Sequence, residues 1–360
     1  MIKCQAAVID WTAVRRVLVI RLRSIGDTVL ATPSLIALRR FLPHAKIDIL
    51  LENWVAPVLD GFDAVDNVIT VGKGSSERIK TAFDLRRLGY DIVFNLHGGT
   101  TSTFFTAATR AKHRVGYANY QYSVLYNRLL SSSSDFWQQE KTHSAEQQLA
   151  LLGFVGVPVD DRPKTRLEVT SQASESLEHK RNATTHRPQS FVDAPYALFH
   201  PTSAFFTKQW ATENFAQTAE FLAGRGIHTI AIASKNENEV LYDLQRESRV
   251  PISTFDDLTL PEVTALASKA EIFVGNDSGI AHISAAVETP SVVIFGSSSR
   301  QHWRPWTDAP NEIVFREFSC QPCAGYACKA FVEPRCILSV QTSDVFAAID
   351  RVLGEKKAGS

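Results

Sequence analysis

The stretch RVLVIRL at residues 16–22, followed by the turn SIGD at 24–27, decides the fold class of this 360-residue chain. A run this rich in Val, Ile and Leu predicts a buried β-strand. Residues 28–41 then carry apolar side chains at helical spacing, and Pro43 ends the pattern, which predicts a helix. A strand, a tight turn and a helix in this order predict the start of a βαβ unit.

The same alternation continues through both halves of the chain. Further strands are expected at residues 46–51, 65–71, 92–96, 196–200, 228–233, 272–275 and 291–295, and further helices at 212–224, 236–247, 261–270 and 279–287. Crossovers of this length require parallel sheets with helices on both faces. We therefore predict an α/β chain of two Rossmann-like, doubly wound domains that face each other across a cleft at the carboxyl ends of their strands.

The domain boundary is expected in a polar stretch. Residues 160–194 include RPK at 162–164 and HRP at 186–188 and have few core-forming positions, so we expect a strand and a linker there. The expected division is an N-terminal domain at 1–175, a C-terminal domain at 176–342, and a final helix and tail at 343–360 that pack back toward the N-terminal domain.

Composition excludes several classes of protein. The chain has 38 Lys and Arg against 38 Asp and Glu, so it has no excess of basic residues with which to bind nucleic acid. An apolar content of 44% argues against disorder. No apolar run approaches the roughly 20 residues that span a bilayer, and residues 1–14 lack the apolar core of a secretory signal. We expect a cytoplasmic location.

Several familiar motifs are missing from the sequence. There is no G-x-G-x-x-G after a strand, no phosphate loop, no G-x-S-x-G elbow and no D-x-D pair. These absences argue against dehydrogenases, P-loop NTPases, α/β-hydrolases and metal-dependent sugar transfer. By themselves they identify no function, and we expect no cofactor.

The first candidate site lies where the first strand meets its helix. Gly26 permits a tight turn there, and Asp27 falls at the start of the helix, where the helix dipole favours a carboxylate. Asp27 at this position is either a simple helix cap or a capping carboxylate that also faces the cleft.

The second candidate site is GNDSGIAH at residues 275–282, which again joins a strand to a helix. Small residues and free N–H groups at a helix start bind phosphate well. Asp277, Ser278 and Gly279 serve either this purpose or only capping, with His282 packed in the helix. The sequence between the strand and the helix is more polar than a cap requires, which favours binding.

Two further features complete the candidates. Lys208 lies in a segment that links the strand at 196–200 to the next helix, where it either neutralises a phosphate or is an ordinary surface lysine. Four of the five cysteines follow as Cys320-x2-Cys323-x4-Cys328-x7-Cys336. They are expected to bind a structural zinc, to stay reduced in a compact loop, or to form a redox-labile pair.

In combination these motifs resemble glycosyltransferase family 9, the ADP-heptose:lipopolysaccharide heptosyltransferases. The resemblance runs from about Arg16 to Ile349. It is carried by RSIGDTVLATP at 23–33, NLHG at 95–98, RVGY at 114–117, DSG-x-x-H at 277–282, P-x-V-x-IFG at 290–296, W-x-P at 303–305 and the cysteine cluster.

The resemblance implies a GT-B fold and an inverting, metal-independent transfer from a nucleotide-activated sugar, ADP-heptose by the family's name. It implies that Asp27 is the catalytic base. It implies that the C-terminal domain binds the donor and the N-terminal domain the acceptor. The implied donor-binding residues are Lys208, Asp277, Ser278, Gly279, His282, Thr202 and Glu239. Near strand ends of the N-terminal domain, Arg23, His97 and Arg114 suit an acidic acceptor and are its expected binding residues.

The sequence departs from the family pattern in two places. ASKNENE at residues 233–239 replaces a glycine-rich turn with an acidic residue for the ribose, which leaves Asn236, Glu237 and Glu239 as alternatives. SSSR at 297–300 replaces the more usual Pro-Thr-Asp-Pro, which leaves the exact donor open.

The implied acceptor is a lipid-linked saccharide of the lipopolysaccharide inner core. This implies peripheral contact with the cytoplasmic face of the inner membrane. Two other functions fit the same architecture: a nucleotide-sugar epimerase, which needs no acceptor, and a non-catalytic module that only binds a sugar nucleotide.

Overall fold

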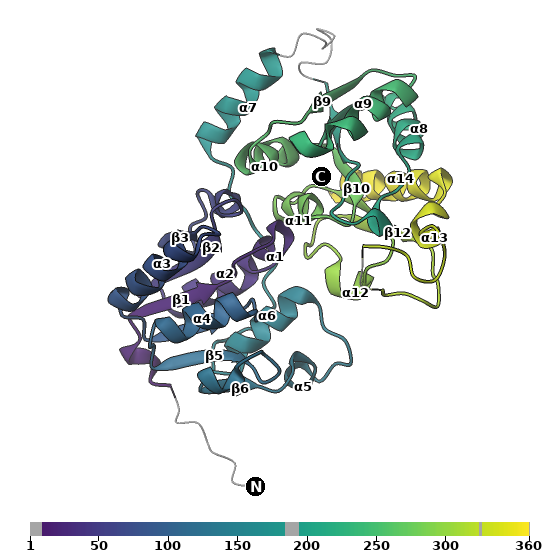
Figure 1. Ribbon diagram of the computed structural model, residues 1–360. Coiled ribbons are helices and arrows are strands. Elements are labelled where there is room, and N and C mark those ends of the chain that lie inside the picture. Colours follow the sequence, from purple (N-terminus) through teal and green to yellow (C-terminus); the bar gives the residue numbers. More distant parts are fainter. Residues whose placement is uncertain (1–8, 184–193, 324–325, 360) are drawn as a thin grey trace. The chain divides into compact units, whose positions relative to one another are not determined.

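The computed structural model describes residues 9–183, 194–323 and 326–359. It divides into two compact units, Met1–Thr165 and Arg166–Ser360 (Figure 1). The expected boundary at 175/176 therefore lies ten residues beyond the observed one at 165/166. Each unit holds one six-stranded sheet of parallel strands with helices on both faces, which confirms the predicted α/β class.

The sheet of the first unit has the strand order β3-β2-β1-β4-β5-β6. Its elements are η1 (Trp11–Ala13), β1 (Arg16–Ile20), α1 (Ile25–Val29), α2 (Thr32–Phe41), β2 (Lys46–Glu52), η2 (Ala56–Leu59), β3 (Asn67–Val71), α3 (Ser75–Leu88), β4 (Ile92–Asn95), α4 (Thr100–Ala108), β5 (His113–Tyr117), η3 (Ser123–Leu125), β6 (Arg128–Leu130), α5 (Ser133–Trp137) and α6 (Ser144–Gly153).

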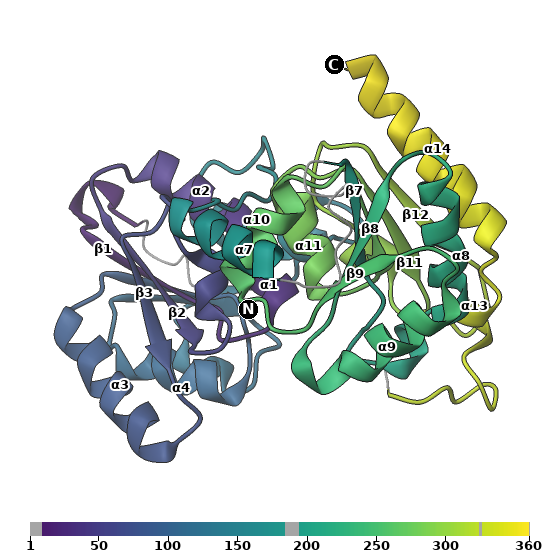
Figure 2. The same cartoon turned by 90° about the horizontal axis from the view of Figure 1, so that it is seen from above.

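β1 lies at the centre of this sheet. Val17 and Ile20 and the residues between them are fully buried, because helices cover the sheet on both sides. α3 contacts α4, and α2 contacts α6. Figure 2 shows α2 on one side of the sheet and the pair of α3 and α4 on the other. The expected continuous helix at 28–41 is wrong. The structure has α1 and α2 instead, because Pro33 lies in the first turn of α2 and has no N–H group to continue the earlier helix.

The second unit repeats the design, with the strand order β12-β11-β10-β7-β8-β9. Its elements are α7 (Ser171–Ala183), β7 (Tyr196–His200), η5 (Phe206–Lys208), α8 (Thr212–Ala223), β8 (His228–Ile232), η6 (Lys235–Glu237), α9 (Asn238–Glu247), β9 (Ile252–Phe255), α10 (Leu260–Ser268), β10 (Ile272–Asn276), α11 (Gly279–Ala286), β11 (Ser291–Phe295), α12 (Arg300–Trp303), β12 (Asn311–Phe315), α13 (Arg335–Leu338) and α14 (Thr342–Gly359).

The long helix α14 closes the core of this unit, where it packs against α8, β11 and β12 (Figure 2). Val345, Ala348, Ile349 and Val352 are fully buried in the same apolar cluster as Phe199 of β7. The expected packing of this helix toward the N-terminal domain stays a prediction.

No helix in the described part of the chain is both long enough and apolar enough to cross a membrane.

The polar stretch expected to form a strand and a linker is in part a helix. α7 spans Ser171–Ala183 and packs against α10, with Leu177 fully buried. The sequence does not show the apolar stripe of a helix here, because polar side chains make many of the contacts of α7 with α10. Ser176 and Lys180 donate hydrogen bonds of 2.7 and 3.0 Å to Glu262 of α10. Burial raises the pKa of Glu262, but these bonds and those from Thr259 outweigh it and lower the pKa to about 2. Residues 184–193 of the expected linker lie outside the described residues.

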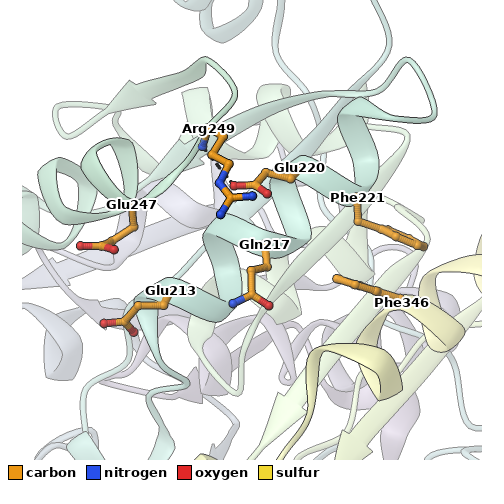
Figure 3. A pocket seen from close by; sticks show the side chains of 7 residues that line it. All are labelled: Glu213, Gln217, Glu220, Phe221, Glu247, Arg249 and Phe346. Carbon is orange, nitrogen blue, oxygen red and sulfur yellow. Dashed lines mark hydrogen bonds between the residues drawn. The ribbon is translucent and has the colours of Figure 1, made fainter.

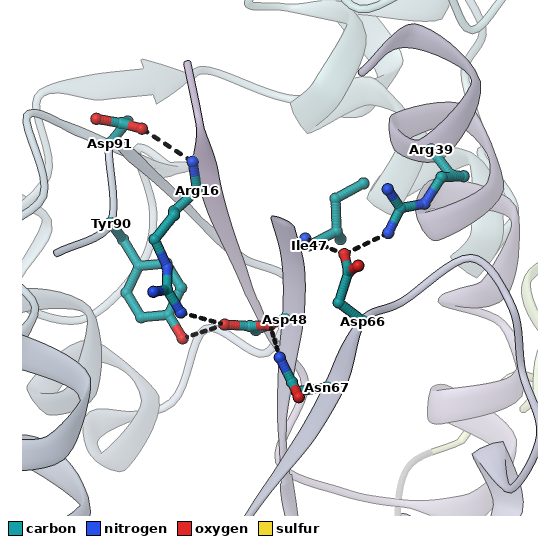
Figure 4. Close-up of polar contacts among 8 residues, drawn as sticks. All are labelled: Arg16, Arg39, Ile47, Asp48, Asp66, Asn67, Tyr90 and Asp91. Carbon is teal, nitrogen blue, oxygen red and sulfur yellow. Dashed lines mark hydrogen bonds and ion pairs between the residues drawn. The ribbon is translucent and has the colours of Figure 1, made fainter. Parts of the chain in front are cut away.

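A buried polar network joins the amino ends of β1, β2 and β3. The carboxylate of Asp48 accepts hydrogen bonds from the Tyr90 hydroxyl at 2.7 Å, from Asn67 at 2.8 Å and from Arg16 at 3.4 Å (Figure 4). Burial and the neighbouring Asp48 raise the pKa of Tyr90, so its hydroxyl keeps the proton that it donates. The network satisfies a carboxylate that would be costly to bury alone.

We expect Tyr90→Phe to lower the free energy of unfolding by about 1–3 kcal/mol, because the buried Asp48 loses a donor that water cannot replace. Urea unfolding at neutral pH measures this change. The matched control is Tyr242→Phe, since Tyr242 is exposed on α9. Equal stability of the two variants would show that the Tyr90 bond contributes nothing.

Candidate functional site

Both sheets reverse their winding direction at an inner pair of strands. β1 and β4 are neighbours in the first sheet, as β7 and β10 are in the second, although two other strands separate each pair along the chain. The connections that leave such a pair run to opposite sides of the sheet and open a crevice at the carboxyl ends of the strands. The segments that carry most of the predicted site residues follow these four strands.

Asp27 lies in the first turn of α1, beyond the carboxyl end of β1. Ser24, the N-cap residue, donates its hydroxyl to Asp27 Oδ2 at 3.0 Å, and the two residues form a reciprocal capping box. Arg21 forms an ion pair with Oδ1 and also donates to the carbonyl of Leu96. The carboxylate is 19% exposed. Asp27 is thus a cap, and it also keeps lone pairs for a further donor.

His97 follows β4 in a loop that Asn95 fixes. Asn95 Oδ1 accepts the backbone N–H groups of His97 and Gly98, both at 3.0 Å. Gly98 has φ +78°, and a side chain there would collide with Tyr120. Burial and the positive charge of Arg21 lower the pKa of His97 to about 4, so its imidazole is neutral at physiological pH.

The residues around His97 form the β1–β4 cluster, defined as Arg21, Arg23, Asp27, Glu52 and His97. The charges of the other four members all act on the pKa of His97. Arg23 is exposed and makes no ion pair within the described part of the chain. The structure therefore brings Asp27, Arg23 and His97 together, as the sequence analysis expects.

Arg114 does not join this cluster. It is the second residue of β5, toward the amino end of that strand, and pairs in register with Val93. Its guanidinium donates to the carbonyls of Leu125 and Ala111, both at 2.7 Å. These contacts tie Arg114 to the segment before β6, and its predicted role in binding the acceptor stays a prediction.

In the second unit, Lys208 and Asp277 meet across the β7–β10 pair. Lys208 Nζ lies 2.6 Å from Asp277 Oδ2, and the Ser298 hydroxyl donates to the same oxygen at 2.5 Å. Asp277 is 5% exposed and Lys208 17% exposed. The ammonium group therefore has a fixed position and still reaches solvent at the carboxyl edge of the sheet.

His200, the last residue of β7, orders the loops beside this pair. Its Nδ1 lies 3.0 Å from the Ser278 hydroxyl and its Nε2 lies 3.2 Å from the Thr202 hydroxyl. Burial lowers the pKa of His200 to about 4, so the imidazole is neutral. Ser278 is the N-cap residue of α11, but its hydroxyl contacts His200 and makes no capping bond to the helix.

Asn276 holds the segment that carries Lys208. Its side chain accepts the N–H of Trp210 at 3.0 Å and donates to the carbonyl of Pro201 at 2.8 Å. The Thr207 and Ser297 hydroxyls lie 2.8 Å apart, which ties the same segment to the end of β11. Lys208 thus lies on a braced loop although its own element is only a three-residue 3-10 turn.

The remaining predicted donor residues differ in their surroundings. Gly279 opens α11, and His282 is buried within that helix. Glu239 is exposed on α9. Glu237 is half-buried, and its negative charge opposes the effect of burial on the pKa of His200. Glu237 also accepts from Ser234, with the hydroxyl at 2.5 Å.

The four late cysteines are free thiols. Burial raises the pKa of Cys323, and the neighbouring Cys320 and Cys328 raise it further. No group of three or more His, Cys, Asp or Glu side chains in the described ranges is arranged to hold a metal.

A separate pocket of about 590 Å³ lies between α8, the end of α9 and α14 (Figure 3). Glu213, Glu220 and Glu247 line it, with Arg249 as the one cation among its lining residues. Three carboxylates repel an anionic group, so this pocket does not suit a diphosphate.

Sequence reasoning missed Glu52, His200 and Ser298. Each follows or ends a strand at the carboxyl edge of a sheet, which is the signal that could have identified them. Ser298 lies in the SSSR stretch at 297–300, where the sequence differs from the family pattern, but only the structure shows that it contacts Asp277.

Comparisons with known proteins place this chain in a family. The model of glycosyltransferase family 9 (heptosyltransferase) matches residues 78–331. Lipopolysaccharide heptosyltransferase 3 of Escherichia coli is 25% identical over 354 residues, covering 93% of this chain and 98% of that protein.

Two solved structures share the fold. A family 9 glycosyl transferase of Veillonella parvula has a TM-score of 0.79 at 19% identity, covering 95% of this chain and 97% of that one. ADP-heptose lps heptosyltransferase II of E. coli has a TM-score of 0.77 at 20% identity, covering 95% and 99%. These likenesses confirm the predicted GT-B fold.

We expect the pKa of His200 to make stability depend on pH. An unfolded chain takes up a proton at this side chain near pH 6.5, whereas the folded chain resists until about pH 4. The free energy of unfolding should therefore fall by up to about 3 kcal/mol as the pH drops from 6.5 toward 4.

Urea unfolding across this pH range compares the wild type with His200→Gln, which should show a shallower slope. His44→Gln is the control, since His44 is exposed. An unchanged slope in His200→Gln would contradict the assignment of a buried neutral imidazole.

Proposed function

Because this chain belongs to glycosyltransferase family 9, the heptosyltransferase family, we propose that it moves a heptose from ADP-heptose to a lipopolysaccharide inner-core saccharide with inversion at the anomeric carbon. The chain is a glycosyltransferase by its family. The observation that carries the finer proposal is the half-buried carboxylate of Asp27, held by Arg21 and Ser24 beyond the end of β1.

In this proposal the second unit binds the donor. Lys208 contacts the diphosphate as a positive point charge, and the first N–H groups of α11, at Gly279 and after it, add hydrogen bonds and a favourable dipole. Ser278 and Thr202 take their orientation from His200 and are available to the donor. For the ribose we propose Glu239, with Glu237 as the alternative, because Glu237 already accepts the Ser234 hydroxyl.

The chemical step needs a base for the acceptor hydroxyl. Asp27 accepts the hydroxyl proton while the hydroxyl oxygen forms a bond to the anomeric carbon of the heptose. The bond from that carbon to the diphosphate oxygen breaks on the opposite face, and ADP leaves with the electron pair. For Asp27 to act, the acceptor hydroxyl must lie within hydrogen-bond reach of its carboxylate when the donor is bound.

Negative charge grows on the diphosphate as it leaves. We assign its stabilisation to Lys208 and the amino end of α11, so that the proposed transfer does not depend on a metal ion. Fixed groups suit this task because they need no reorganisation during the reaction. The bracing of the Lys208 loop by Asn276 supplies that rigidity.

The acceptor is assigned to the β1–β4 cluster. Arg21 is paired with Asp27 there, whereas Arg23 is exposed and makes no ion pair among the described residues, so its guanidinium is available to a phosphate of an acidic saccharide. His97 contributes a neutral imidazole, which donates or accepts hydrogen bonds to sugar hydroxyls without a net charge. Arg114 is left out of this set because it lies toward the amino end of β5, where its Nε and Nη1 donate to backbone carbonyls.

We expect Asp27→Asn to reduce turnover with ADP-heptose and an inner-core acceptor by several hundredfold or more, because the amide cannot take the proton. The affinity for ADP should stay the same, since the donor contacts lie in the second unit. Release of ADP and isothermal titration with ADP measure the two quantities.

Asp160→Asn is the matched control, because Asp160 is an exposed carboxylate in the same unit. Thermal unfolding of both variants separates a loss of folding from a loss of chemistry, which matters because Asp27 also caps α1. Normal turnover of a folded Asp27→Asn would overturn the assignment of the base.

We expect Lys208→Met to weaken ADP binding by at least about tenfold, the usual cost of losing a hydrogen bond to a charged group. The double variant Lys208→Met/Asp277→Asn separates direct contact with the diphosphate from a role of Lys208 only as the partner of Asp277. Weak binding in the double variant supports direct contact with the diphosphate, and recovered binding rules it out.

A further inference from the structure

An apolar surface lies on the outer side of α3 and α4 in the first unit. Ile79 and Phe83 of α3 are 53% and 62% exposed, and Phe104 of α4 is 45% exposed. α3 and α4 lie side by side (Figure 2), and a pocket of about 460 Å³ runs between these three side chains. We call this surface the α3–α4 patch, with Arg86 and Arg110 as its cationic lining.

The exposed side chains of the patch do not belong to the face of α3 that packs in the core. Ala82 and Leu85 of α3 are buried against the sheet, in the apolar cluster of the first unit. Ile79, Phe83 and Arg86 follow one another at spacings of four and three residues, which places them on a second face of the same helix. An outward-facing apolar face with two exposed rings marks a surface that meets something other than water.

Positive charge surrounds the apolar side chains. Residues 73–112 contain seven Lys and Arg against three Asp and Glu, within a chain whose formal net charge is zero. The exposed cations of this stretch are Lys73, Lys80, Arg86, Arg87, Arg110 and Lys112. None of Arg86, Arg87 and Arg110 has an ion pair among the described residues, and the carboxylate of Asp91 is occupied by the N–H groups of Arg15 and Arg16.

We propose that the α3–α4 patch docks the enzyme on an anionic lipid bilayer. Exposed Phe rings with an apolar groove fit the boundary between headgroups and acyl chains, and unpaired Arg and Lys side chains fit lipid phosphates around them. The charge complementarity is the reason to choose a bilayer, because a cationic rim without carboxylate partners matches a surface of many phosphates.

The patch lies where a docked bilayer would bring a lipid-linked acceptor to the enzyme. This part of the inference rests on the proposed function. α4 begins at Thr100, three residues after His97 of the β1–β4 cluster, and Phe104 lies one turn further along the same helix. A bilayer in contact with Phe104 therefore lies close to the cluster assigned to the acceptor. The lipid anchor of the acceptor can then stay in the membrane while its saccharide reaches Asp27.

Sedimentation with vesicles tests the proposal on the full chain. We expect the wild type to bind vesicles of equal parts phosphatidylcholine and phosphatidylglycerol, to bind phosphatidylcholine alone far more weakly, and to release from the anionic vesicles as salt is raised. Arg86→Glu/Arg110→Glu should lower the partition constant by at least about tenfold, since each reversed charge removes an attraction and adds a repulsion. Phe83→Ser should lower it as well.

Matched controls use exposed residues outside the patch. Tyr242→Ser and Lys329→Glu change side chains of the second unit and should leave vesicle binding unchanged. No binding by the wild type, or an equal loss in the controls, would overturn the proposal. Because the vesicles carry no saccharide, this result does not depend on whether the proposed transfer reaction is correct.

Two further measurements separate docking from other roles. With a deacylated, water-soluble acceptor, Arg86→Glu/Arg110→Glu should keep wild-type turnover, and a comparable loss there would mean that the residues support the fold or the chemistry instead. Sedimentation velocity tests for a second copy as the occupant. Self-association of the wild type that Phe83→Ser abolishes would assign the patch to a dimer interface and reject the lipid surface.

Discussion

The parallel pairing of β7 with β10, two strands that lie far apart in the sequence, is the constraint on which the donor edge depends. It brings Lys208 to Asp277 across 69 positions of sequence, and it places His200 beside Ser278 across 78. The pairing of β1 with β4 does the same for Arg21 and the loop of His97. Without these two pairings the polar residues would be scattered along the chain, so the sheet order makes both candidate sites.

The buried polar groups of the second unit form a support for a small number of exposed ones. Asn276 and His200 are buried. Asn276 bonds to both ends of the segment that carries Lys208, and His200 joins Thr202 of that segment to Ser278 at the start of α11. Because both side chains are neutral, they order the loops without an unpaired charge in the interior. Of the two charged groups at the edge, Asp277 is buried and Lys208 is 17% exposed, so the ammonium group is the one that solvent and a ligand can reach.

The sequence predicts the fold more fully than the sites. Strands such as 16–22 and 272–275 are detectable because both of their faces are buried, so Val, Ile and Phe dominate them. α7 escapes detection because hydrogen bonds to Glu262 replace part of the apolar stripe that signals a helix. Asp27 and Lys208 follow from motifs, but Arg114 shows the limit of that reasoning, since a cation near a strand in the sequence can lie at either end of it.

The packing of α14 has a consequence for the order of events during synthesis. Everything that the first unit needs for its core lies before residue 165, so that unit can fold while the rest of the chain is still being made. The second core includes Ile349 and Val352, which are synthesised after all six strands of that sheet. Until then β11 and β12 keep an apolar face uncovered, and the nascent chain is vulnerable to aggregation in that interval.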